Sequence, residues 1–152
     1  MPTALVVEDE VLLAIEIEAL LDEAGFEPVG HALKSGDAIK LARELKPDFA
    51  LVDVHLLDGP TGVDVARRLA LELGILVVFM TGNARRVPTD FAGAYGLIEK
   101  PYTDSGLLAA LRHIQARLSG ERTGEPPPAL ELAPRYDPRR AKAGSQSRHA
   151  AE

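Results

Sequence analysis

The sequence predicts an α/β fold in which an open, doubly wound parallel sheet of five strands is covered by helices on both faces. Short apolar runs alternate five times with longer helical stretches along the chain. Three of these runs lack polar alternation, which is typical of strands that are buried on both faces of a parallel sheet. The 152 residues are too few for an eight-unit barrel, which needs about 250. The common strand order of such a five-stranded sheet is 2-1-3-4-5, and we expect it here.

Five β-type runs are the expected strands, and each is short. They cover residues 4–7, 28–32, 49–52, 76–80 and 96–98. Because consecutive parallel strands need crossover connections, the segments between them should be helices joined with right-handed crossovers.

Apolar stripes at helical spacing predict four helices, over residues 10–24, 36–45, 62–73 and 105–118. The first of them, for example, carries Leu13, Ile17 and Leu20 at spacings of four and three. Residues 83–94 are the exception, because Pro88 interrupts them and their apolar period is poor. We expect a weak helix of low local stability there.

The charge balance and the apolar content divide the chain into a domain, residues 1–119, and a tail, residues 120–152. The domain holds 11 basic and 18 acidic residues, whereas the tail holds 6 and 5. The tail has five prolines, and its large apolar side chains are two leucines and one tyrosine. With so few apolar groups to offset the ordering entropy, we expect this tail to be disordered or to order only on a partner.

Composition excludes several classes of protein. Cysteine is absent, which rules out disulfides, thiolate metal sites and thiol nucleophiles. The longest unbroken apolar run, residues 75–80, is far shorter than the roughly 20 residues of a membrane helix, and the amino terminus lacks a secretory signal. We therefore expect a cytoplasmic protein without membrane contact. The acidic domain argues against nucleic-acid binding, although a basic cluster in the tail leaves it open there: Arg135, Arg139, Arg140, Lys142 and Arg148.

Polar residues follow four of the five predicted strands. They are Glu8 and Asp9, then Asp53, then Thr81 and Gly82, and finally Glu99, Lys100 and Pro101. The carboxyl ends of parallel strands meet at one edge of the sheet, so these groups should converge. Strands one and three are neighbours in the expected order, which places Asp9 opposite Asp53.

Carboxylates gathered at one edge repel each other and need a counter-charge. Oxygen ligands of this kind suit Mg²⁺, which is typically held by one or two carboxylates and several waters. An aspartate beside a metal ion, a lysine and a hydroxyl can act as a nucleophile toward phosphorus and form an acyl phosphate. Asp53, Lys100 and Thr81 are the candidates for these three roles, and Gly82 leaves the approach open.

This arrangement resembles the receiver domain of two-component response regulators, over residues 3 to about 118. The resemblance implies the flavodoxin-like strand order and a phosphoryl group that Asp53 accepts from a histidine kinase or a histidine phosphotransfer protein. It implies a Mg²⁺ ion held by Glu8, Asp9, Asp53 and the backbone carbonyl of His55. Thr81 and Lys100 match the hydroxyl and the lysine of the family, in which the peptide bond before Pro101 is cis.

The sequence departs from the family pattern in four places. Glu8 stands where Asp is commoner, and the loop 55–62 is one residue longer and lacks a proline found there in the family. Leu97 replaces the aromatic residue that swings inward during the switch, so the switch must work differently. Residues 77–82 partly resemble the Phe-Ala-Thr-Gly signature of an alphaproteobacterial class of single-domain receivers, and three residues agree: Phe79, Thr81 and Gly82.

The resemblance implies a signalling phosphoacceptor rather than an enzyme, with at most self-catalysed phosphotransfer and autodephosphorylation. A tail of 33 residues cannot form a DNA-binding domain, so a stand-alone receiver would act through a downstream protein partner. A homodimer through the face made by the fourth helix, fifth strand and fifth helix is a further expectation.

Two alternatives stay open at this point. The first is a degenerate receiver that binds partners without phosphate. The second is a phosphohydrolase with an Asp nucleophile; such enzymes have a second Asp two residues later, where this sequence has His55, and a cap domain, which this chain lacks.

Overall fold

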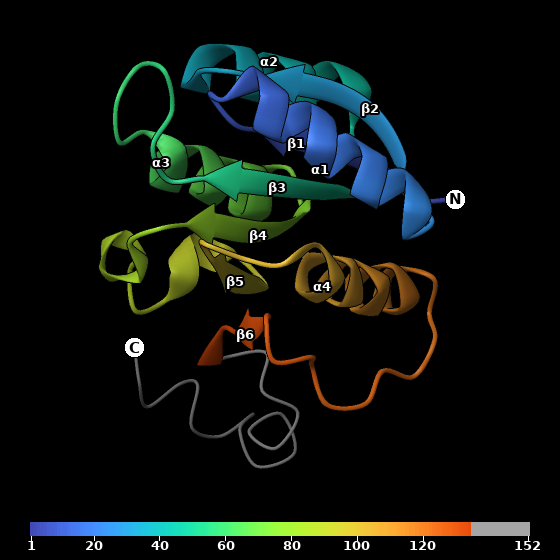
Figure 1. Ribbon diagram of the computed structural model, residues 1–152. Helices are drawn as coiled ribbons and strands as arrows, with labels where there is room; N and C mark the ends of the chain where they lie inside the picture. The colour runs from blue at the N-terminus through green and yellow to red at the C-terminus, as the bar shows by residue number, and fades with distance from the viewer. Residues whose placement is uncertain (135–152) are drawn as a thin grey trace.

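The computed structural model describes residues 1–134, and its centre is a six-stranded sheet in the order β2-β1-β3-β4-β5-β6 (Figure 1). The first five strands are parallel, and β6 is antiparallel to β5. The strands are β1 (Thr3–Val7), β2 (Glu27–Ala32), β3 (Phe49–Asp53), β4 (Leu76–Thr81), β5 (Gly96–Glu99) and β6 (Glu131–Leu132). The α/β class and the order of the first five strands are confirmed, and all five begin and end within one residue of the predicted positions.

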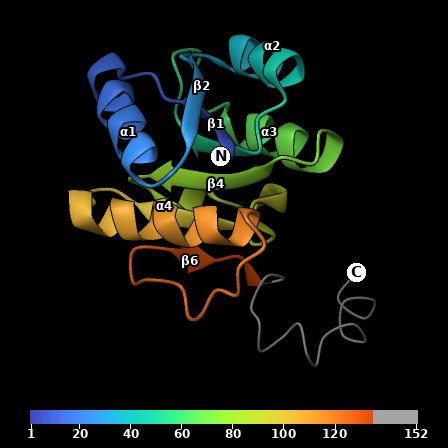
Figure 2. The same ribbon diagram turned by 90° about the vertical axis from the view of Figure 1, so that its right-hand side faces the viewer.

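Helices cover both faces of the sheet (Figure 2). α1 (Val11–Glu23) and α4 (Asp104–Leu118) pack on one face, and α2 (Ser35–Leu45) and α3 (Gly62–Arg67) on the other. α3 continues directly into a π-helical turn, η1 (Arg68–Glu72). Each face has its own apolar core, and the shared strands are buried from both sides, which is why β3 reads as an unbroken apolar run in the sequence.

The weak helix expected over residues 83–94 is absent. Two short 3₁₀ turns replace it, η2 (Ala84–Arg86) and η3 (Phe91–Gly93). Pro88 between them has no N–H to donate to a helix. The Asp90 side chain instead accepts a hydrogen bond from the Ala92 N–H at 2.9 Å, and Ala92 has a φ of +52°, outside the helical region. The connection between β4 and β5 is therefore a loop with two single turns.

The expected disorder of the tail, residues 120–152, is wrong for residues 130–133, which the structure packs against β5. Residues 131–132 form β6, and Leu130 and Ala133 are buried in the two cores. Averaging the composition over the whole tail concealed this, because two apolar side chains are enough to anchor a short segment at an uncovered strand edge. Residues 135–152, including the basic cluster, lie outside the described part of the chain.

Within residues 1–134, no helix is both long enough and apolar enough to cross a bilayer.

Gly62, the first residue of α3, lies directly against the end of β3. Its N–H donates to the Val54 carbonyl at 2.9 Å, and a Cβ at this position would lie 1.9 Å from the Asp53 carbonyl oxygen. We predict that Gly62→Ala lowers the free energy of unfolding by about 2 kcal/mol or more, because backbone atoms must shift to admit the methyl group. Urea unfolding measures this effect.

The matched control is Gly36→Ala in α2, where a Cβ would meet nothing within 4 Å. That substitution should raise stability by up to about 1 kcal/mol, since alanine favours a helix over glycine. Equal effects of the two substitutions would contradict the steric account.

Protonation of His113 on α4 opposes folding. Tyr95 Oη lies 3.0 Å from His113 Nε2, and burial, aided by the Arg117 charge, lowers the pKa of His113 below its usual 6.5. The unfolded chain therefore binds the proton at this histidine more readily, so the contribution of His113 to stability falls as the pH drops below about 6.5. His113→Gln, which cannot titrate, lacks this contribution, and its stability relative to the wild type should rise in thermal or urea melts from about pH 7.5 to 5.5. Parallel pH profiles of the two proteins would refute the assignment.

Candidate functional site

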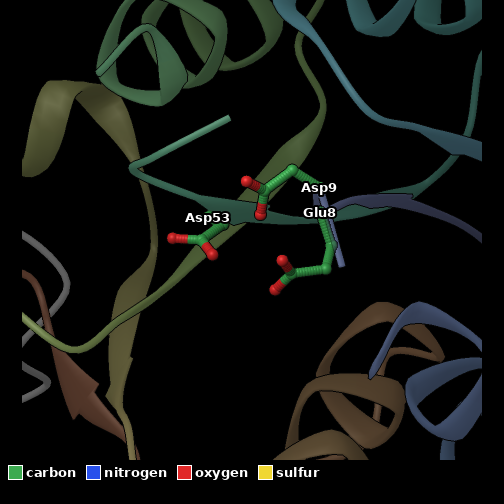
Figure 3. Close-up of side chains that lie close together, drawn as sticks. All are labelled: Glu8, Asp9 and Asp53. Carbon is green, nitrogen blue, oxygen red and sulfur yellow. The ribbon is translucent and has the colours of Figure 1, made fainter. Parts of the chain in front are cut away.

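The acidic residues predicted from the sequence meet at the carboxyl ends of β1 and β3 (Figure 3). Glu8 and Asp9 follow β1, and Asp53 is the last residue of β3. Each offers a carboxylate oxygen, and these oxygens all lie within 4.8 Å of one another. The neighbouring position of β1 and β3 thus produces the cluster, as the strand order predicted.

Lys100 supplies the counter-charge from the end of β5. Its Nζ donates to Asp53 Oδ2 at 2.8 Å and to Glu8 Oε1 at 3.0 Å. Its backbone N–H donates to the Thr81 carbonyl at 2.8 Å, and the peptide bond to Pro101 is cis, as the family resemblance implied. One ammonium group therefore connects two strands whose acidic ends would otherwise repel each other.

Burial dominates the electrostatics of Glu8. Its side chain is 1% exposed, and this desolvation raises its pKa to about 7. The Glu10 N–H and Lys100 lower the pKa, whereas Asp9 and Asp53 raise it further. Glu8 consequently changes its charge near neutral pH, and the negative charge of the cluster changes with it.

Lys100 remains charged. Burial is the largest single effect on its pKa and lowers it, but the hydrogen bonds and charges of Asp53 and Glu8 together outweigh burial and raise the pKa above its usual value. A permanent positive charge thus faces Asp53.

Thr81 ends β4, the strand beside β3, and its side chain is buried. Its hydroxyl oxygen accepts a hydrogen bond from the Asn83 N–H at 3.0 Å. Gly82 between them is exposed, and a Cβ there would meet nothing within 4 Å. The hydroxyl therefore lies at the start of the loop between β4 and β5, and the approach beside it is open as expected.

His55 contacts Asp53 through its backbone. Its N–H donates to Asp53 Oδ1 at 3.2 Å, while its side chain is exposed. This geometry holds the carboxylate in place from the loop side. The role of the His55 carbonyl as a metal ligand stays a prediction.

The longer loop after Asp53 is organised by Asp58, a residue that the sequence analysis missed. The Asp58 carboxylate accepts hydrogen bonds from the backbone and hydroxyl of Ser35 and from the Thr61 hydroxyl, and these contacts, the Ser35 hydroxyl first, lower its pKa. They connect the loop to the first residue of α2. The Asp58-Gly59 pair is a turn signal and could have indicated this role.

His31 is a second residue that was missed. Its Nε2 donates to the backbone carbonyl of Glu8 at 2.9 Å and thereby supports the end of β1. No sequence spacing signals this contact, because it depends on the register between β1 and β2, in which Val6 faces His31.

Leu97 occupies the position where the family has its mobile aromatic residue, and it is buried opposite Phe79 of β4. Tyr95 lies two residues earlier and packs in the other core, beside His113. Tyr95 therefore does not take the place of that aromatic residue.

Comparison with known proteins gives a consistent result. The family model described as the response regulator receiver domain matches residues 4–112. The phyllosphere-induced regulator PhyR of Methylorubrum extorquens is 33% identical over 109 residues, which are 70% of this chain and 41% of that protein. The transcriptional regulatory protein PdtaR of Mycobacterium tuberculosis is 32% identical over 110 residues, 70% of this chain and 53% of that protein. The chain thus spans about half the length of these curated relatives.

A solved structure has the same fold. The signal receiver domain of a modulated diguanylate cyclase from Desulfovibrio desulfuricans G20 is 28% identical, with a TM-score of 0.66 over 79% of this chain and 95% of that one. The likeness extends over most of both chains and shows a shared fold.

Removal of the Lys100 charge should expose the repulsion that it offsets. We predict that Lys100→Met lowers the free energy of unfolding by about 2 kcal/mol, less than for a fully buried pair because the lysine side chain is 22% exposed. Mg²⁺ should restore part of the loss, since a divalent cation replaces the missing charge. Urea unfolding with and without Mg²⁺ measures both effects.

Lys40→Met, on the exposed side of α2, is the matched control and should change little in either condition. The double variant Lys100→Met with Asp53→Asn should recover some stability, because one of the two facing carboxylates is removed. A Lys100→Met protein as stable as the wild type would refute the proposed balance of charge.

Proposed function

Because this chain belongs to the response regulator receiver domain family, we propose that it is the phosphoacceptor of a two-component phosphorelay and that Asp53 receives the phosphoryl group. The observation that carries the proposal is the position of Lys100 Nζ, in hydrogen-bond contact with both Asp53 and Glu8. A lysine so placed offsets part of the negative charge of the acidic cluster in the resting protein and is in reach of a phosphoryl oxygen on Asp53.

The transfer step needs a phosphohistidine as donor, in a histidine kinase or a histidine phosphotransfer protein. An Asp53 carboxylate oxygen attacks the phosphorus, the new P–O bond forms as the P–N bond breaks, and the imidazole leaves with the electron pair and takes up a proton. Lys100 stays charged throughout and offsets the negative charge on the phosphoryl oxygens. The Thr81 hydroxyl can donate a hydrogen bond to one of them.

The donor set fits Mg²⁺, a hard cation that prefers oxygen ligands. Glu8, Asp9 and Asp53, with the His55 backbone carbonyl, would hold the ion. When bound, it offsets negative charge on the phosphoryl oxygens during transfer.

The response to phosphorylation would pass through Thr81 and Lys100. Thr81 precedes the loop that carries η2 and η3, in which the chain has two single turns instead of a helix. A segment with so few regular hydrogen bonds rearranges at low energetic cost, so movement of Thr81 toward the phosphoryl group can reshape it. This route needs no aromatic ring at Leu97, and its product is a changed surface for a downstream protein partner.

The surface beside the site suits a protein donor. Three apolar side chains at the start of α1, next to Asp9, are exposed: Val11, Leu12 and Ile15. Leu12 is 78% exposed, and such a cluster at the rim of a charged site is typical of a surface for protein association. We infer that the phosphohistidine protein docks on this cluster.

Direct phosphorylation tests the acceptor. Incubation with acetyl phosphate or beryllofluoride plus Mg²⁺ should shift the amide resonances of Thr81 and Lys100 and of the loop between β4 and β5, because these groups face the modified carboxylate. Asp53→Asn should show no such shift. Shifts that persist in Asp53→Asn, or their absence in the wild type, would reject Asp53 as the acceptor and favour phosphate-independent binding.

Donor docking is tested separately from the chemistry. Leu12→Ser should slow transfer from a phosphorylated histidine phosphotransfer protein about tenfold, as expected when roughly 1.4 kcal/mol of apolar contact is lost. It should leave labelling by acetyl phosphate unchanged, because that small donor needs no docking surface. Gel assays with radioactive phosphate measure both rates.

Leu71→Ser is the matched control for docking. Leu71 is 57% exposed but lies on η1, away from α1. An equal slowing by both substitutions, or a loss of acetyl phosphate labelling in Leu12→Ser, would contradict the assignment of the α1 cluster.

A further inference from the structure

The outer edge of β5 is covered by a segment that we call the strap, residues 127–134. Within it, β6 pairs with β5 in an antiparallel register, with Leu132 opposite Gly96 and Glu131 opposite Leu97. The Ala133 N–H adds a hydrogen bond to the Tyr95 carbonyl at 2.9 Å. The strap therefore occupies the backbone donors and acceptors that this edge would otherwise present.

The edge of β5 is shaped to receive a strand at close range. A Cβ on Gly96 would lie 2.6 Å from the Glu131 carbonyl oxygen and 3.0 Å from Leu130 Cδ1, so a larger residue at 96 would push the strap away. Leu130 is 3% exposed and packs in the core beneath α4, and Ala133 is buried in the core of the opposite face. The edge of β5 thus has a glycine at its centre and one apolar position on each side of the sheet. We call these two positions the Leu130 seat and the Ala133 seat.

The strap is nevertheless lightly held. Its regular strand is two residues long, and the prolines at 126–128 have no N–H to donate to the sheet. A hollow of about 380 Å³ remains between the strap, the end of β5 and the start of α4, lined in part by Glu99, Tyr102 and Pro128. The segment before it contains Gly120 at a φ of +80° and Gly124 in open space, which permits a hinge.

We propose that the edge of β5 is a docking surface for an extended segment of a partner protein, and that the strap masks it until that segment displaces the strap. The incoming strand would need a Leu-x-Leu-Ala pattern like residues 130–133, with a large apolar side chain for the Leu130 seat and a small one for the Ala133 seat. Main-chain hydrogen bonds to β5 would supply affinity, and the two seats would supply specificity.

The surface stands independently of phosphorylation at Asp53, because the strap contacts the start of β5 and the site lies at its end. The strap also restricts the homodimer expected through the face that contains β5, because such a dimer would have to form around the strap or displace it.

The probe is a fluorescently labelled peptide of residues 126–134. Its binding to the full-length wild type and to full-length variants is measured by fluorescence anisotropy. Leu130→Asp should release the strap, because a carboxylate cannot occupy the apolar seat, and this variant should bind the labelled peptide at least tenfold more tightly than the wild type. Glu131→Gln is the matched control, since that side chain is exposed, and it should behave as the wild type. Adding Gly96→Ala to Leu130→Asp should abolish binding, because the methyl group blocks the edge.

Equal binding to the wild type and to Leu130→Asp would show that the strap masks nothing. A folded Leu130→Asp protein that does not bind the peptide would overturn the docking surface, and so would binding that survives Gly96→Ala. If Leu130→Asp does not fold, Leu130→Ser takes its place with the same expectations. Since the unphosphorylated protein is used throughout, these outcomes are distinct from a failure of Asp53 as the acceptor.

Discussion

The ammonium group of Lys100, held between Glu8 and Asp53, is the interaction on which the functional edge depends. Three carboxylates converge where β1 and β3 end, and the strand order makes their proximity unavoidable. Without a cation this edge would be strained by repulsion at every pH at which the groups are ionised. Burial raises the pKa of Glu8 toward neutrality and so reduces its negative charge, and the Lys100 ammonium offsets a further part of the negative charge of the cluster. The carboxylates keep a net negative charge in the resting protein, which a bound cation could offset.

The same lysine gives the site a mechanical connection. Its backbone N–H bonds to the Thr81 carbonyl, and the preceding residue, Glu99, pairs with Thr81 across β4 and β5. Any change in charge at Asp53 therefore acts on the ends of two strands. Beyond them lies a loop with two single turns and no α-helix. A rigid sheet that ends in a pliable loop converts a local electrostatic change into a change of surface.

Local signals were sufficient for the fold and for the centre of the site. Buried parallel strands read as apolar runs, and the residues that follow such runs lie at one edge of the sheet by topology alone. The convergence of Glu8, Asp9, Asp53 and Lys100 could therefore be predicted without coordinates. The contact of His31 with Glu8 could not be predicted in this way, because it joins segments 23 residues apart and depends on strand register. Asp58 has a turn signal beside it, but its contact with Ser35 also spans 23 residues and depends on the shape of the loop. The helix expected over residues 83–94 is wrong because its place between two parallel strands outweighed the local signals against it, Pro88 and a poor apolar period.

The strap shows a different limit of predictions that rest on amino-acid composition. A tail rich in proline with two leucines has too little apolar surface to form a core of its own, and that inference is physically sound. It fails for residues 130–133 because the core was already present: β5 is the last parallel strand, and its outer edge leaves unpaired backbone and two apolar seats. A short segment needs little burial when its partner is preorganised. β5 consequently connects the two functional regions of the molecule, with Lys100 at its end facing the acidic cluster and Gly96 at its start facing the strap.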